Sequence, residues 1–350
     1  MRILHLAAGN RWTGAAAPAF AEVEALRAAG VDAHYAYVGG YKLQAKLAHH
    51  DFAHPLIEKA QNPLAFRRSV DALDRLITHH GFDVVHAHLT YDHWLARWVA
   101  RDHDVLLART FHARRVLRRD VFSRALIRRT ELLFVVNHAF RDAPALSGRE
   151  VVFTPPPLKL EEFSPEGPDA RALYSFSPST KVVTVIGKLS KDRGFEEALR
   201  TFAALRRMRD DVRMMIIGHG EHRPVLESLT HSLGITPDVT FAGYHEDDLA
   251  EHYRASNLLL FTARGSDEGH RAILEAMACG VPVVTYPIEG VEALVGAPMI
   301  AAAPEPSALA LVAHAILNAP PDVTARAQEF GYEQAAQRLI DAYGGVVGDR

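Results

Sequence analysis

The chain is poor in cysteine, in long apolar runs and in excess charge. Cys279 is the one cysteine among 350 residues, so neither an internal disulfide nor a CxxC metal site can form. No window approaches about eighteen uninterrupted apolar residues, which predicts no transmembrane helix. Polar residues follow the first apolar run, a pattern that disfavours a signal peptide. We expect a cytoplasmic protein, either free or peripheral on the inner membrane face.

Short apolar runs alternate with amphipathic helical stretches along the chain. Continuous apolar runs are typical of strands buried on both faces of a parallel sheet. Three consecutive prolines interrupt the series, and residues 155–168 are therefore interpreted as a linker. We predict an α/β protein of two doubly wound, Rossmann-like domains that face each other across a cleft. The predicted boundaries are 1–165, 166–320 and a last helical segment over 321–350.

The stretch GSDEGHRAILEAMACGVPVVTYP, Gly265–Pro287, places polar residues directly before a small-residue helix. Helix N-termini carry unpaired N–H groups and partial positive charge, which suit a phosphate. Glu275 would repel a phosphate, but its carboxylate can accept two hydrogen bonds from the neighbouring hydroxyls of a ribose. Complementing the helix dipole is the alternative role for this side chain.

Arginines gather in one short segment of a chain whose net charge is only −3. Eight arginines and a single acid, Asp120, lie between Arg109 and Arg129. Apolar residues at helical spacing predict a basic amphipathic helix over this segment. A solvated helix face, an anionic acceptor site and a membrane-surface contact through Arg114–Arg129 all fit such a helix. Attraction of nucleic acid is a weaker idea, and we expect no specific nucleic-acid partner.

His86 and His88 lie two residues apart and face the same side of a predicted strand. Such a pair can contribute to a zinc site, but the sequence shows no third ligand. We therefore predict no metal and no cofactor.

The segment LEAMACGVPVV, Leu274–Val284, resembles the retaining glycosyltransferases of the GT-B fold, family four, known as glycosyl transferases group 1. The resemblance implies that Glu275 holds the ribose of a nucleotide donor and that Asp267 holds the hydroxyls of the transferred sugar. Asp267 stands where the family usually has glutamate. Of the glycines that normally follow the first acid in the family, only Gly269 remains. The resemblance implies that the backbone N–H groups of His270, Arg271 and Ala272 face the β-phosphate.

Further motifs extend the resemblance over most of the chain. In VIGKLSKDRGF the resemblance assigns Gly187 to the donor site and Lys188 and Arg193 to its diphosphate, whose charge two cations would stabilise as the nucleotide leaves. The remaining assignments are Gly218 in a strand-end G-x-G, Gly243 and Tyr244 beside the base, His112 near the donor sugar, Gly14 near the phosphates, and Phe330–Tyr343 as a helix that crosses back to the first domain.

The resemblance implies retaining, metal-independent transfer of a sugar from a nucleotide-diphosphate sugar to a hydroxyl acceptor on a glycan, glycolipid or small molecule. We identify no enzymatic nucleophile. Two alternatives remain: a GT-B sugar-nucleotide epimerase or hydrolase, and a non-catalytic sugar-nucleotide binder. Two departures from the family pattern, Asp267 for glutamate and Ala113 for glycine, leave the second open.

Overall fold

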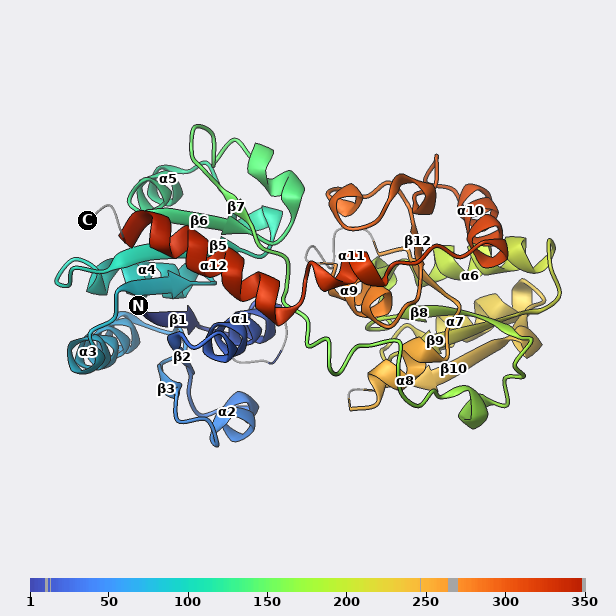
Figure 1. Ribbon diagram of the computed structural model, residues 1–350, viewed down its shortest axis with the longest axis horizontal. Coiled ribbons are helices and arrows are strands. Elements are labelled where there is room, and N and C mark those ends of the chain that lie inside the picture. The colour runs from blue at the N-terminus through green and yellow to red at the C-terminus, as the bar shows by residue number, and fades with distance from the viewer. Residues whose placement is uncertain (10–11, 13, 246, 264–269, 348–350) are drawn as a thin grey trace. The chain divides into compact units, whose positions relative to one another are not determined.

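The chain forms two compact α/β units. A computed structural model describes residues 1–9, 12, 14–245, 247–263 and 270–347 (Figure 1). Unit 1 comprises Met1–Pro157 together with Phe330–Arg350, and unit 2 comprises Leu158–Glu329. Each unit is built on a parallel sheet flanked by helices, so the predicted pair of doubly wound domains is confirmed.

Unit 1 holds a seven-stranded sheet in the order β3-β2-β1-β4-β5-β6-β7, all parallel. The order reverses direction beside β1, which is the point where doubly wound sheets bind ligands at their carboxyl edge. The strands are β1 Arg2–Ala7, β2 Asp32–Val38, β3 Ala53–Ile57, β4 Val84–Ala87, β5 Leu106–Phe111, β6 Leu132–Val135 and β7 Val152–Phe153. The helices are α1 Ala16–Ala28, α2 Lys42–Leu47, α3 Pro63–His80, α4 Thr90–Val99, α5 Val121–Arg128 and α12 Tyr332–Val347.

The last helix, α12, packs on unit 1 although it follows unit 2 in the chain. It lies beside α1 (Figure 1, red and dark blue). Leu339 and Tyr343 of α12 are fully buried in the same apolar cluster as Val23 of α1 and Phe134 of β6. This apolar stripe makes α12 part of the first unit's core, as expected for a helix that crosses back.

Unit 2 holds a five-stranded parallel sheet in the order β10-β9-β8-β11-β12. The strands are β8 Lys181–Ile186, β9 Val212–Ile217, β10 Val239–Gly243, β11 Leu258–Phe261 and β12 Val283–Thr285. The helices are α6 Phe195–Arg206, α7 Arg223–Ser232, α8 Leu249–Arg254, α9 Arg271–Ala278, α10 Pro306–Asn318 and α11 Thr324–Gln328.

Three glycines hold the carboxyl ends of β8, β9 and β10 in backbone contact. The Gly187 N–H donates to Ile217 O at 3.0 Å, and the Gly218 N–H donates to Gly243 O at 2.6 Å. A Cβ on Gly218 would overlap the carbonyl oxygen of Gly187, and its φ of 139° is a conformation that favours glycine. The G-x-G pattern in this chain therefore serves close packing of the loops.

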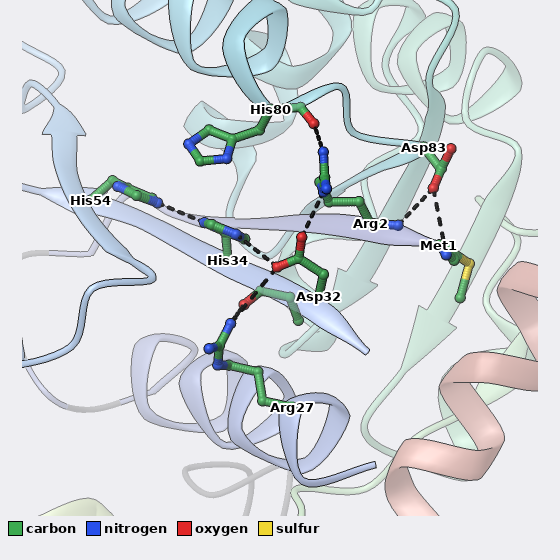
Figure 2. Close-up of polar contacts among 9 residues, drawn as sticks. Met1, Arg2, Arg27, Asp32, His34, His54, His80 and Asp83 are labelled. Atoms are coloured by element: carbon green, nitrogen blue, oxygen red, sulfur yellow. Dashed lines mark hydrogen bonds and ion pairs between the residues drawn. The ribbon is translucent and has the colours of Figure 1, made fainter. Parts of the chain in front are cut away.

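A polar network closes the opposite, amino-terminal edge of the unit 1 sheet, as Figure 2 shows. Arg2 Nε donates to Asp32 Oδ2 at 2.6 Å, and Asp32 Oδ1 lies 3.0 Å from His34 Nε2. His34 Nδ1 in turn lies 2.9 Å from His54 Nε2. Parallel strands begin at this edge, far from the carboxyl ends where ligands bind, and we interpret the network as structural.

The arginine-rich segment departs from the single helix predicted for it. Residues Arg114–Val116 form a short 3₁₀ turn, and α5 begins only at Val121, where Asp120 caps it through the Ser123 N–H at 2.9 Å. Leu126 is buried, whereas Val121 and Phe122 are 67% and 73% exposed. The apolar residues therefore do not share one buried face, since Val121 and Phe122 in the first turn of α5 are exposed while Leu126 is buried. Within the described ranges, no helix combines the length and the apolar character needed to cross a bilayer.

We predict that Gly218→Ala lowers the free energy of unfolding of unit 2 by about 3 kcal/mol or more, from steric overlap in addition to backbone strain. The matched control is Gly234→Ala, since Gly234 also has a positive φ of 69° but no atom within 4 Å of a new Cβ. This control should cost only about 1 kcal/mol. Urea unfolding of both variants measures the difference, and equal losses would contradict the close-packing account.

Candidate functional site

Lys188 and Arg193 flank the loop that leaves β8. Lys188 is exposed and lies 3.6 Å from Glu221 through its Nζ atom, in an ion pair with both side chains open to solvent. Exposed pairs of this kind contribute little to stability, so Lys188 can exchange Glu221 for another anion. Arg193 ends the 3₁₀ turn Lys191–Arg193 and is half-buried. Gly194 follows as the N-cap of α6, and its carbonyl accepts a hydrogen bond from Thr262 Oγ1 at 2.8 Å.

An aromatic pair lies at the neighbouring strand ends. Tyr244 follows β10 and is 60% exposed, and its ring packs edge-on against His219 with 5.1 Å between centroids. His219 stands between Gly218 and Gly220 and is exposed as well. Exposed rings with open faces can stack on a nucleobase. The motif predicted a base contact near Gly243 and Tyr244 but did not single out His219.

Helix α9 begins with a residue in an unusual conformation. His270 is its N-cap and has a φ of 50°, a left-handed geometry that non-glycine residues rarely adopt. Its ring is buried and packs against Phe261 with 5.6 Å between centroids. The Ile273 N–H donates a hydrogen bond to His270 O at 3.0 Å and begins the hydrogen bonding within α9. The preceding N–H groups, those of Arg271 and Ala272, point along the helix axis at its positive end.

Glu275 projects from α9 into the protein and is only 5% exposed. Its Oε1 accepts from Arg271 Nε at 2.7 Å, and its Oε2 accepts from the Tyr253 hydroxyl at 3.0 Å. The carboxylate raises the pKa of Arg271, whose side chain is 49% exposed. Because Glu275 is buried behind these partners, access for a ribose would come from the side of Arg271, whose side chain is 49% exposed. The ribose role of Glu275 therefore stays a prediction.

Of three further predicted site residues, the structure describes only Gly14. Asp267 and Gly269 lie outside the described residues. Gly14 lies in the connection between β1 and α1, two residues before α1 begins, and has a φ of 63°. The predicted contact of Gly14 with the phosphates, like the predicted roles of Asp267 and Gly269, rests on the resemblance alone.

His112, just after β5, ends a line of hydrogen-bonded histidines in unit 1. His112 Nε2 lies 2.9 Å from His88 Nδ1, and His88 Nε2 lies 2.9 Å from His5 Nδ1. Burial, together with the charge of Arg109, lowers the pKa of His112 to about 3. The imidazole is therefore neutral near neutral pH and presents one N–H and one lone pair.

Sequence reasoning missed the groups that meet this line. Glu22 of α1 is 1% exposed, and its Oε2 lies 3.6 Å from His5 Nδ1 and 3.7 Å from His88 Nε2. Burial raises the pKa of Glu22 to about 8 against the opposing charge of Arg338. Tyr343 of α12 contacts the same cluster, with its hydroxyl 2.6 Å from His86 Nδ1. A glutamate among the apolar residues of the first helix was the signal that could have revealed Glu22.

A buried ion pair, also missed, lies beside the histidines. Arg109 of β5 is 1% exposed, and its Nη1 lies 3.7 Å from Oδ1 of fully buried Asp92. Asp92 accepts hydrogen bonds from the N–H groups of Ala8 at 3.0 Å and Leu89 at 2.6 Å. Burial raises the pKa of Asp92 to about 7 and lowers that of Arg109 to about 10, and the attraction between the two charges opposes both shifts. The arginine inside the apolar run LLARTF was the signal, because a buried charge requires a partner.

Unit 1 also contains an open pocket of about 690 Å³ beside the carboxyl ends of β2 and β3. Polar and charged side chains line much of it, including those of Gln44, Glu58, Arg68 and Asp71. Arg68 and Glu58 form a two-pronged ion pair at its rim, with Nη2–Oε2 at 2.6 Å.

Comparison with known proteins extends these observations. Residues 180–319, all within unit 2, match the family described as "Glycosyl transferases group 1". The 2-deoxystreptamine glucosyltransferase of Streptomyces kanamyceticus is 28% identical over 179 residues, which are 48% of this chain and 46% of that protein. The D-inositol 3-phosphate glycosyltransferase of Geodermatophilus obscurus is 27% identical over 307 residues, 75% of this chain and 66% of that protein.

The fold of the whole chain is shared with solved glycosyltransferase structures. Anabaena HepE in complex with UDP superposes with a TM-score of 0.81 at 18% identity, covering 99% of this chain and 100% of that one. At this identity the likeness establishes the GT-B fold. The chain spans less than two thirds of the length of each of the first four curated relatives.

We predict that Asp92→Asn destabilises unit 1 by about 3 kcal/mol, because it leaves the guanidinium of Arg109 buried without a counter-charge. Arg109→Met should cost a similar amount for the reciprocal reason. The double variant should cost about 2 kcal/mol less than the sum of the single changes, since neither charge then remains unpaired. Chemical unfolding of all four proteins measures this coupling, and strictly additive losses would contradict it.

Proposed function

We propose, on the premise that residues 180–319 form a glycosyl transferases group 1 domain within a GT-B fold, that the protein transfers a sugar from a nucleotide-diphosphate sugar to a hydroxyl acceptor. The observation that carries the proposal is the arrangement at the carboxyl edge of unit 2. Cationic Lys188, the N-terminus of α9 and the His219–Tyr244 ring pair all follow strands of one parallel sheet. Such an edge is where doubly wound sheets bind nucleotides.

The leaving nucleotide determines what the site must stabilise. Negative charge grows on the diphosphate as its bond to the sugar breaks, and fixed cations at that position lower the barrier. Lys188 and Arg193 supply these charges from one loop. Two cationic side chains replace a divalent metal in this role, so the transfer step itself needs none.

The sugar and ribose ends of the donor use other groups. Asp267 and neutral His112 hold the hydroxyls of the transferred sugar, and Glu275 holds the ribose after releasing Arg271. From the family resemblance we take a front-face displacement: the acceptor oxygen bonds to the anomeric carbon on the face from which the diphosphate leaves, the hydroxyl proton passes to the departing phosphate oxygen, and configuration is retained. The polar pocket beside β2 and β3 is our candidate for the acceptor, because hydroxyl-rich molecules need lining donors and acceptors.

The transfer reaction is tested by its dependence on the acceptor. A panel of nucleotide-diphosphate sugars is first ranked by the rise in melting temperature that each produces. The best donor is then incubated with and without candidate acceptors, while nucleotide diphosphate and sugar anomers are followed. Release that rises with acceptor supports transfer with retention. Release without acceptor indicates a hydrolase, a new sugar isomer indicates an epimerase, and binding without turnover indicates a binder.

We predict that Lys188→Met lowers kcat/KM for the donor by about 100-fold, as expected when one cation at a developing oxyanion is removed. The matched control is Lys191→Met, which removes the same charge three residues further along the same loop. The control should leave kcat/KM nearly unchanged. Equal losses in the two variants would mean that the loop acts only through its overall charge.

The acceptor side of the proposal includes a membrane contact through α5 and the turn before it. Val121 and Phe122 are exposed large apolar residues in a segment rich in arginine. Apolar side chains that insert among lipids, combined with basic residues that attract anionic headgroups, are typical of peripheral membrane binding. Contact of this kind places unit 1 beside a lipid-linked acceptor.

We predict that Phe122→Ser weakens binding to vesicles containing anionic phospholipid by about tenfold or more, through loss of buried apolar area. Leu311→Ser is the control, since Leu311 is 62% exposed on α10 of unit 2 without a comparable arginine cluster. Co-sedimentation at several salt concentrations provides the measurement. Wild-type protein that stays in the supernatant at low salt would refute the membrane contact.

A further inference from the structure

Three metal-ligating atoms from separate elements converge in the core of unit 1. They are His5 Nδ1 of β1, Glu22 Oε2 of α1 and His88 Nε2 after β4. The two nitrogens are 2.9 Å apart, and the carboxylate oxygen lies 3.6 and 3.7 Å from them. The side chains are at most 1% exposed, and Glu22 Oε2 is a buried oxygen that accepts no hydrogen bond from the described residues.

The dimensions of this triangle suit a small divalent cation. The point equidistant from the three corners lies in their plane, about 2.0 Å from each, which matches the bond lengths of zinc to histidine nitrogen and carboxylate oxygen. The tetrahedral geometry that zinc prefers would require a fourth ligand and a small outward shift of the metal from this plane. Two imidazoles and one carboxylate are also a ligand set that zinc accepts. A hydrogen-bonded cluster without a metal would leave the buried Glu22 Oε2 with no hydrogen bond from the described residues, which is costly.

We propose that His5, Glu22 and His88 form a structural zinc site in unit 1. The proposal does not depend on the transfer chemistry, although the site borders it through the contact of His88 with His112. His86 is the nearest further ligand, since one of its atoms lies within 4.8 Å of the other three. Its two nitrogens now contact the Tyr343 hydroxyl at 2.6 Å and Thr110 Oγ1 at 2.7 Å, so ligation by His86 would exchange one of these bonds.

The groups around the triangle orient its ligands. With Nε2 of His88 on the metal, the ring proton of His88 resides on Nδ1 and is donated to His112 Nε2 at 2.9 Å. His5 Nε2 likewise contacts the Tyr343 hydroxyl at 3.4 Å. The metal therefore fixes the tautomer of His112, whose own proton must then lie on Nδ1. It also ties α1, β1 and the end of β4 together inside the fold.

The test measures the metal content of untagged protein expressed in zinc-supplemented medium and dialysed against a chelating resin. Wild type should retain about one zinc per chain, because a buried structural site forms with the fold and releases its ion slowly. Glu22→Gln, which keeps the side-chain volume, should retain almost none. Protein unfolded with a chelator and refolded with zinc should melt about 5 °C or more above protein refolded without it.

Two control variants identify the source of any metal found. His252→Gln disrupts a second group of potential ligands in unit 2, His245, Asp248 and His252. His34→Gln removes a histidine whose Nδ1 also lies 2.9 Å from another histidine, His54. The carboxylate of Asp32 contacts the other ring nitrogen of His34, so these groups do not converge on one point (Figure 2). Both controls should keep the zinc. The proposal is overturned if wild type is metal-free and melts alike after both refolding treatments, if Glu22→Gln keeps the metal, or if His252→Gln loses it.

Discussion

Backbone contact among three strand ends positions the residues that we propose to bind the donor. The loops after β8, β9 and β10 approach so closely that Gly218 has no space for a side chain, and the hydrogen bond from its N–H to Gly243 O joins two loops directly. Lys188 and Tyr244 follow these contacts in the chain, so their positions are set by backbone packing and not by their own side chains. Because the backbone at this edge is held in place, its side chains can stay exposed and exchange partners without losing their positions.

Unit 1 differs from unit 2, because the polar groups near the carboxyl edge of its sheet are buried and must pair with one another. Asp92 compensates Arg109 and also accepts two backbone N–H groups, which joins the loop after β1 to the start of α4. The histidine line brings β1, β4 and β5 together, and Tyr343 brings α12 into the same network. Such networks specify one arrangement of the elements, since each partly satisfied alternative is costly.

The sequence predicts the fold well and the site only partly, for physical reasons. Periodicity and the proline break reveal two doubly wound units because strand burial and helix amphipathicity are local properties of the chain. Pairings across the sheet are not local: nothing near His88 indicates that Glu22 lies beside it, more than sixty residues away. The arginine-rich segment was wrongly predicted as one helix because spacing alone does not show where Asp120 caps it. The ribose role of Glu275 stays a prediction, and the sequence alone does not show its pairing with Arg271, which depends on how α9 begins.

The account depends most on unit 2 binding a nucleotide diphosphate at the carboxyl edge of its sheet. The most direct measurement is a crystal structure of the protein grown with the donor nucleotide that stabilises it most. The account predicts a diphosphate within hydrogen-bonding distance of Lys188 and of the first N–H groups of α9, with Glu275 turned from Arg271 to the ribose. A diphosphate bound elsewhere, with the Glu275 contacts to Arg271 and Tyr253 unchanged, would contradict it.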